Sequence, residues 1–383
     1  LKVDFGSLGR KPDLRCASLP RAGLGAPILG GRPAARRRVL AVLAMTDHSP
    51  ASGPVCVTGA TGYISSFVVK MLLERGYTVR GTTRSTKPEK VQHLTSLPGA
   101  AERLTLFEAD LLEEGSFVEP ITGCVGVYHM ASPFFLAGQT EEALVPPALE
   151  GTRNVLGTCL KLGVKKVVLT SSTAAVYCKY GDCTPETVYT EDDWSNEEGM
   201  RSHGFWYALS KQLAEKAAWE MVKDTPMKLA TMNPCLVLGP MLQPTLNTSC
   251  AAVLAYMNGS RAEVEATPKP IVDVRDVALA HILGMESAAY EGRTLLIGAS
   301  FPWGDARPWL ADAVPACAPN FPTAQQDPST LPAPKDWAMG SPGAHTKYDC
   351  SKAEALGVKF TSAEDSIKST AVDLAKWGHF KPA

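Results

Sequence analysis

Short apolar runs rich in β-branched residues alternate with stretches of helical periodicity between residues 55 and 234. The runs predict strands at 55–59, 78–84, 104–110, 126–131, 166–172 and 228–234. Helical periodicity follows at 67–75, 113–121, 141–163 and 204–222. Apolar strands that alternate with helices form a parallel sheet covered on both faces. The pattern therefore predicts an α/β fold with a doubly wound, Rossmann-type parallel sheet.

The pattern changes near residue 235, where we expect a smaller C-terminal substrate lobe to begin. Residues 247–258 look helical, a helix follows Ile271 and runs through Met285, and 293–298 reads as a strand. Residues 300–345 show no clear period, so Trp303, Trp309 and Trp337 are either packing or substrate contacts. We expect residues 45–235 to form the cofactor domain, and 236–383 mainly the lobe, with some elements returning to the first domain.

A glycine turn links the first predicted strand to the first helix, in the order Gly59-x-x-Gly62-x-x-Ser65. Glycine lets the backbone approach a pyrophosphate closely, and the helix N-terminus offers free N–H groups to the anion. Ser65 replaces the third glycine, whose usual role is close packing of helix on strand, so we expect some spreading there. A glycine turn without a ligand is the alternative.

The end of the second predicted strand carries no acidic residue that could bind the adenosine ribose of NAD. Arg84 stands there instead, with Lys87 and Lys90 close behind. Guanidinium and ammonium groups suit a 2′-phosphate. The sequence therefore favours NADP(H) as cofactor, and an ordinary surface cation is the alternative for Arg84.

Tyr207 and Lys211 lie four residues apart at the start of a predicted helix over 206–222. This spacing places both side chains on one helical face. A phenol donates a proton more readily near neutral pH when a cation stabilises its phenolate. The pair therefore predicts a general acid, and an ordinary surface Tyr and Lys is the alternative.

With the sequence TSSTAAVY at 170–177, these motifs make the chain resemble the extended short-chain dehydrogenase/reductases. The likeness is strongest to the dihydroflavonol reductase and cinnamoyl-CoA reductase group. It is dense over about residues 54–299, and is carried by the segments LLERGYTVR at 72–80, GVYH at 126–129, LAEKAAW at 213–219 and PCLVLGP at 234–240.

The resemblance implies hydride transfer from the nicotinamide to the carbonyl carbon of an aldehyde or ketone. Tyr207 would protonate the oxygen, Lys211 would lower the Tyr207 pKa and hold the nicotinamide ribose, and Ser172 would bind the carbonyl oxygen, with Thr173 as the second candidate. The same likeness implies that a further set of residues lines the cofactor together with Tyr207 and Lys211: Thr58, Gly59, Gly62, Tyr63, Ile64, Arg84, Lys90, Asp110, Leu111, Met130, Ala131, Ser132 and Pro234.

Two departures from the group's pattern bear on the substrate. Residues 204–211 read GFWYALSK where cinnamoyl-CoA reductases carry NWYCYGK, and Tyr177 stands where dihydroflavonol reductases usually carry Asn. We therefore expect a reductase of another aldehyde or ketone. Phe134, Phe135, Trp206 and Leu236 line an apolar pocket or belong to the core.

Two other functions share the fold. A nucleotide-sugar epimerase or dehydratase keeps NAD bound, and Arg84 argues against it because such enzymes generally place an acid near that position. The other is a catalytically idle dinucleotide sensor or assembly subunit. The presence of Ser172, Tyr207 and Lys211 argues against it, because the fold alone does not require these residues.

Composition and charge limit the classes of partner and the cellular compartment that we expect for this chain. The net charge of −1 gives no reason to expect nucleic acid, and no apolar run reaches the length of a membrane span. Ten cysteines without a Cys-x-x-Cys pair read as reduced thiols, with no metal site. We expect a monomer or homodimer.

The basic first 44 residues indicate a disordered or targeting extension. Met45 as the physiological start, and so a cytoplasmic enzyme, is favoured over a plastid or mitochondrial transit peptide.

Overall fold

The computed structural model describes residues 48–132, 140–179, 187–327, 329 and 347–381. Within them, seven parallel strands form one central sheet. Their order across the sheet is β3 (Leu104–Glu108), β2 (Val79–Thr83), β1 (Val55–Val57), β4 (Gly126–His129), β5 (Lys166–Thr170), β7 (Lys228–Pro234) and β11 (Gly292–Leu296). Every predicted strand is present, and the α/β doubly wound fold is confirmed.

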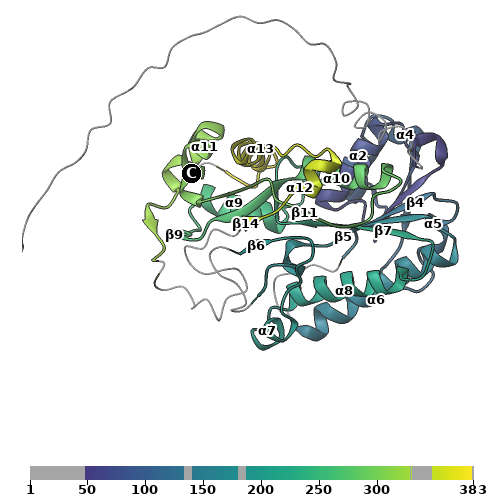
Figure 1. Ribbon diagram of the computed structural model, residues 1–383. Helices are drawn as coiled ribbons and strands as arrows, with labels where there is room; N and C mark the ends of the chain where they lie inside the picture. The colour runs from purple at the N-terminus through teal and green to yellow at the C-terminus, as the bar shows by residue number, and fades with distance from the viewer. Residues whose placement is uncertain (1–47, 133–139, 180–186, 328, 330–346, 382–383) are drawn as a thin grey trace, which may run out of the picture. The chain divides into compact units, whose positions relative to one another are not determined.

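Helices cover both faces of this sheet (Figure 1). On one face lie α6 (Glu141–Lys161) and α8 (Trp206–Val222), and on the other α2 (Tyr63–Glu74) and α10 (Val274–Glu286). The alternation along β1 explains this arrangement, because successive side chains of a strand point to opposite faces. Val55 and Val57 pack in the cluster that holds residues of α2 and α10, and Cys56 packs with residues of α6 and α8.

The chain returns to the central sheet after it has left it at residue 235. Strand β11 pairs with β7, with Leu295 opposite Asn233, and the predicted strand over 293–298 is thereby found. The rest of the C-terminal part is built on a second sheet of β8 (Leu236–Leu238), β10 (Lys269–Asp273) and β12 (Ala299–Phe301). Strand β11 belongs to the central sheet although it follows residue 235. The division into a first domain up to residue 235 and a mainly separate lobe after it stays a proposal.

Helices α9 (Thr248–Met257), α11 (Ala306–Ala313) and α13 (Ala363–Lys376) pack around that second sheet (Figure 1). The smaller elements are α3 (Pro88–Thr95), α4 (Ala100–Arg103), α5 (Val118–Ile121), α7 (Glu197–Ser202), α12 (Ser351–Leu356), β6 (Val188–Tyr189), β9 (Glu263–Val264), β13 (Ala324–Gln325), β14 (Lys347–Tyr348), and the 3₁₀ turns η1 (Pro50–Ser52), η2 (Thr173–Ala175), η3 (Trp303–Asp305) and η4 (Pro315–Asn320).

Two of the tryptophans that sequence left unassigned are packing residues. Trp303 is buried and stacks on Tyr256, with ring centroids 4.7 Å apart, and Trp309 packs against Phe301 at 5.3 Å. The predictions for residues 1–44, Phe134, Phe135 and Trp337 lie outside the described residues.

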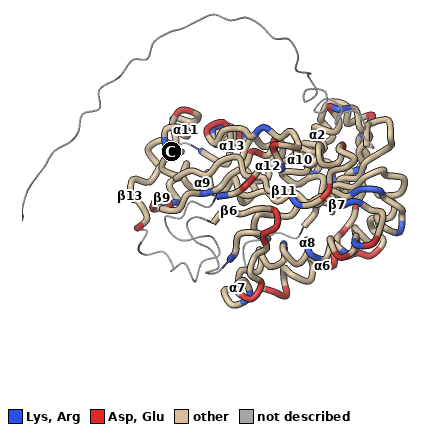
Figure 2. The backbone as a smooth tube through the Cα atoms, in the orientation of Figure 1, with Lys and Arg blue, Asp and Glu red and all other residues tan. Residues whose placement is uncertain are grey.

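Basic and acidic side chains are interspersed along the described chain, in keeping with the small net charge (Figure 2). A membrane-spanning helix needs a long apolar stretch, and the helices that the structure describes include none of that kind.

Candidate active site

The glycine turn after β1 forms a cradle to which Gly59 and Gly62 contribute no side chain. Gly59 has φ +62°, and a Cβ on it would lie 3.0 Å from the Ala131 Cα. A Cβ on Gly62 would lie 3.2 Å from the Gly59 carbonyl oxygen. Gly62 is also the N-cap of α2 and places no side chain over the first N–H groups of that helix. The turn therefore fits a pyrophosphate, which needs close backbone approach and a helix N-terminus.

Ser65 stands in the third glycine position and is buried. Its hydroxyl oxygen would lie 3.3 Å from a Cβ on Gly62, so a side chain at position 62 would make a tight contact with Ser65.

Thr58 ties the end of β1 to the end of β4. Its hydroxyl oxygen accepts hydrogen bonds from the backbone N–H groups of Met130 and Ala131, both at 3.0 Å, and lies 3.1 Å from Nδ1 of His129. The hydroxyl proton is therefore donated to Nδ1. Burial, reinforced by the charge of Lys211, lowers the His129 pKa to about 3, so the imidazole is neutral at physiological pH.

Replacing Thr58 by Val should destabilise the protein by about 1–3 kcal/mol, because two part-buried N–H groups and the buried Nδ1 of His129 lose their partner. Valine keeps the shape of the side chain. We expect the urea midpoint to fall with an unchanged slope, whereas a midpoint equal to that of the native protein would show that the hydroxyl contributes nothing net.

Most of the remaining residues predicted to line the cofactor follow the carboxyl ends of strands, and the others lie on α2 and α3. Arg84 follows β2 directly and is exposed, and Lys90 is exposed on α3. Asp110 and Leu111 follow β3, the segment Met130, Ala131 and Ser132 follows β4, and Pro234 ends β7. Tyr63 and Ile64 begin α2, but the Tyr63 hydroxyl donates to the Gly239 carbonyl at 3.0 Å, so its ring reaches toward the C-terminal part.

Ser172 and Tyr207 are brought together at the same edge of the sheet. Ser172 follows β5 and caps η2, where its hydroxyl oxygen accepts from the Ala174 N–H at 3.1 Å. Its side chain is also hydrogen-bonded to the Tyr207 hydroxyl. The Thr173 hydroxyl lies deeper and donates to the Pro234 carbonyl at 3.4 Å. The geometry therefore favours Ser172 over Thr173 as the partner of Tyr207.

Burial is the main influence on the pKa of Tyr207. Burial raises the Tyr207 pKa above its ordinary value, and the hydrogen bond to Ser172 offsets only part of that rise. The Lys211 Nζ lies 6.0 Å from the centre of the Tyr207 ring. The prediction that Lys211 lowers the Tyr207 pKa stays a prediction, because burial sets the net direction here. Tyr207 carries its proton at neutral pH, as a donor must.

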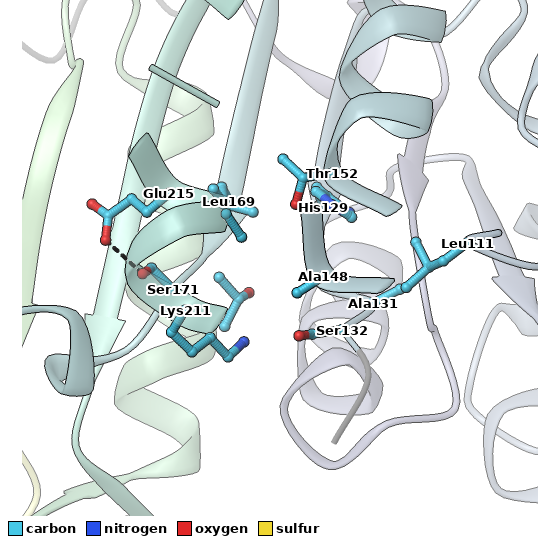
Figure 3. Close-up of a pocket in the computed structure, with 12 residues that line it drawn as sticks. Leu111, His129, Ala131, Ser132, Ala148, Thr152, Leu169, Ser171, Lys211 and Glu215 are labelled. Carbon is cyan, nitrogen blue, oxygen red and sulfur yellow. Dashed lines mark hydrogen bonds between the residues drawn. The ribbon is translucent and has the colours of Figure 1, made fainter. Parts of the chain in front are cut away.

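Lys211 lines a cavity that has α8 and the end of β5 on one side and the end of β4 and α6 on the other (Figure 3). Burial lowers the Lys211 pKa to about 8, and the charge of Glu215 raises it in part. Figure 3 shows Lys211, Glu215 and Ser171 on one side of this cavity and His129, Thr152, Ala131 and Ser132 on the other.

Three polar residues at this site, His129, Ser171 and Glu215, were missed by sequence reasoning. Glu215 follows Lys211 by one helical turn, and this spacing was the available signal. Trp206 and Leu236, proposed for an apolar pocket, are half-buried and pack against separate hydrophobic clusters.

Comparison with known proteins gives a match over the region that contains these motifs. The sequence profile of the NAD dependent epimerase/dehydratase family matches residues 55–298, more than half of the chain. The chain belongs to this family. The predicted membership in the extended short-chain dehydrogenase/reductases is thereby confirmed.

Proteins that are similar to this chain include several reductases. The chain is 43% identical over 325 residues to the cinnamoyl-CoA reductase CAD2 of Medicago truncatula, an alignment that covers 84% of this chain and 95% of that protein. The structure of vestitone reductase from alfalfa superposes with a TM-score of 0.71 at 30% identity, covering 86% of this chain and 100% of that one. A yeast methylglyoxal/isovaleraldehyde reductase solved with NADPH gives 0.72 at 29% identity, over 85% and 100% of the two chains.

Proposed function

We propose that this chain is an NADPH-dependent reductase that transfers a hydride to an aldehyde or ketone, with Tyr207 as the general acid. The observation that carries the proposal is the hydrogen bond between Ser172 and Tyr207, with Lys211 one helical turn further along the same edge of the sheet. That edge also carries the glycine cradle of Gly59 and Gly62. Relatives whose names describe reductases of carbonyl compounds support it.

Each residue has a separate task in this reaction. The cofactor, when bound, supplies the hydride. Ser172 donates a hydrogen bond to the carbonyl oxygen, which polarises it, and Tyr207 transfers its phenolic proton to that oxygen as negative charge develops. Lys211 stabilises the resulting phenolate and binds the nicotinamide ribose. Thr58 holds the end of β4 against the glycine turn, which keeps the segment Met130–Ala131 beside the cradle.

The cofactor predicted from sequence, NADP(H), is confirmed through the relative solved with NADPH and the reductases around it. We assign the 2′-phosphate to Arg84 and Lys90, which are exposed beyond β2. The reductase class and the carbonyl substrate are likewise in agreement with these relatives.

NADPH should bind at least about tenfold more tightly than NADH, and Arg84→Ala should erase most of that preference, since a charge-assisted contact to phosphate is worth about 1.5–3 kcal/mol. Fluorescence titrations of both nucleotides against the native protein and the variant measure this. Lys70→Ala, which removes a cation from the outer side of α2 paired with Glu74, is the control and should leave both affinities unchanged. Equal affinities in the native protein would contradict the assignment of Arg84.

We propose an aldehyde or ketone as the substrate, in place of the thioester of cinnamoyl-CoA reductases or the dihydroflavonol of dihydroflavonol reductases, on the departures at 204–211 and at Tyr177. A screen of NADPH consumption with purified residues 45–383 over aliphatic and aromatic aldehydes, ketones and acyl-CoA thioesters tests this. Preferred turnover of a thioester would contradict the substrate class while leaving the reductase intact.

We keep the proposal of a cytoplasmic monomer or homodimer. The cysteines of the described segments all carry free thiols, in agreement with a reducing compartment. Light scattering on the purified protein measures the oligomeric state.

A further inference from the structure

A buried carboxylate lies behind the Tyr207–Lys211 pair and is surrounded by donors. Glu215 on α8 is fully buried. Its Oε1 accepts from Nε of Arg293 at 2.7 Å and from the Thr231 hydroxyl at 2.8 Å. Its Oε2 accepts from the Ser171 hydroxyl at 2.6 Å and from the Asn233 amide at 2.9 Å. Every one of these neighbours is a donor, so the arrangement suits the charged carboxylate, which only accepts.

This cluster is joined to the reacting groups in two ways. Ser171 is the chain neighbour of Ser172, and the Asn233 amide that binds Glu215 also donates to the Ser172 carbonyl oxygen at 3.2 Å. Glu215 and Lys211 line the same cavity, one helical turn apart (Figure 3). The cluster therefore contacts the backbone that carries Ser172, and it places a carboxylate in the cavity that Lys211 lines.

Arg293 connects the cluster to the segment after β6. Its guanidinium donates from Nη1 to the carbonyl oxygens of Glu191 and Asp193 and lies 3.7 Å from the centre of the Trp194 ring. Arg293 is buried, and a buried cation is costly unless an anion is paired with it. The carboxylate of Glu215 provides that anion.

We propose that Glu215 is a positioning residue: its carboxylate, anchored by Arg293, places a negative charge one helical turn from Lys211 and fixes the Ser171–Ser172 backbone beside Tyr207. The inference rests on the proposed function, in which Lys211 acts as a cation. A carboxylate that serves only the fold would leave the titration of Lys211 unchanged.

The charged and titratable groups that face Lys211 come from three elements. Glu215 and Tyr207 lie on α8 with it, His129 faces it from β4, and Arg293 of β11 acts through Glu215. From β5 and α6 the cavity receives only neutral side chains, those of Leu169, Thr170, Ser171, Ala148 and Thr152. His129 is neutral, so the carboxylate of Glu215 is the nearby charge that favours the ammonium.

The test is the pH dependence of NADPH binding, with turnover measured in parallel. With its pKa at about 8, Lys211 loses its charge above that pH, so native affinity should fall on the alkaline side. Glu215→Gln should move the midpoint of this fall to lower pH by about one unit or more, because an opposite charge has been removed. Glu215→Asp keeps the charge and should restore the native midpoint.

Glu286→Gln is the matched control, since Glu286 also pairs with an arginine, Arg75, but lies at the far end of α10. It should leave the midpoint unchanged. A midpoint in folded Glu215→Gln equal to that of the native protein would overturn the proposal. If Glu215→Gln does not fold, Arg293→Gln tests the same charge balance with the opposite sign: loss of a cation should raise the midpoint, and an unmoved midpoint would overturn the proposal.

The binding measurement separates this inference from the proposed function. If the native protein binds NADPH but reduces no carbonyl, the proposed function fails, and the alkaline midpoint of binding still decides the role of Glu215.

Discussion

Tyr207→Phe should slow carbonyl reduction by about 10²–10⁴-fold while leaving NADPH affinity close to native, because it removes a positioned proton donor and keeps the ring. The hydroxyl that is lost is the one hydrogen-bonded to Ser172. Single-turnover kinetics with saturating NADPH isolate the step, and a separate fluorescence titration measures the cofactor affinity.

Tyr189→Phe is a control of the same kind. Its hydroxyl donates to the Tyr177 carbonyl at 3.3 Å, in the hydrophobic cluster behind the site. We expect it to keep native turnover to within about threefold, in line with the modest net worth of one neutral hydrogen bond. Full activity of Tyr207→Phe on a carbonyl that the native protein reduces would remove Tyr207 from the mechanism.

Lys211→Ala should differ from Tyr207→Phe by damaging both binding and turnover. The ammonium is assigned to the nicotinamide ribose, and loss of that charged donor should weaken NADPH by at least about tenfold. Turnover should also fall by about 10²–10⁴-fold, because the phenolate left by proton transfer loses its stabilising cation.

Lys216→Ala, five residues along the same helix, removes an exposed ammonium that lies 5.3 Å from the centre of the Trp194 ring. It should change neither quantity appreciably. If Lys211→Ala lowered turnover but bound NADPH like the native protein, the ribose contact would have to be given up.

The fold and the position of the site were predictable because they depend on local patterns. Val55 and Val57 alternate with Cys56 in a way that requires a strand covered on both faces. Gly59 adopts the positive φ that its place in the turn requires. Tyr207 and Lys211 share a helical face because their spacing matches the helical repeat.

The electrostatics of the site were not predictable, because they depend on elements distant in sequence. Spacing shows that Lys211 is near Tyr207 but says nothing of how deeply the phenol is buried, and burial sets the direction of its pKa. The partners of Glu215 come from the residue after β5, from β7 and from β11, and Arg293 is 78 residues away along the chain. The packing role of Trp303 likewise depends on a residue distant in sequence, because its ring stacks on that of Tyr256.

The central claim is hydride transfer from NADPH to a carbonyl carbon with a proton supplied by Tyr207. The most direct measurement follows NADPH deuterated at C4 through single turnovers with the aldehydes and ketones of the screen, for the native protein and Tyr207→Phe. We predict deuterium on the carbinol carbon of the alcohol formed by the native protein, and slowing by about 10²–10⁴-fold in Tyr207→Phe. NADPH binding without deuterium transfer to any carbonyl, or equal transfer by the two proteins, would contradict the account.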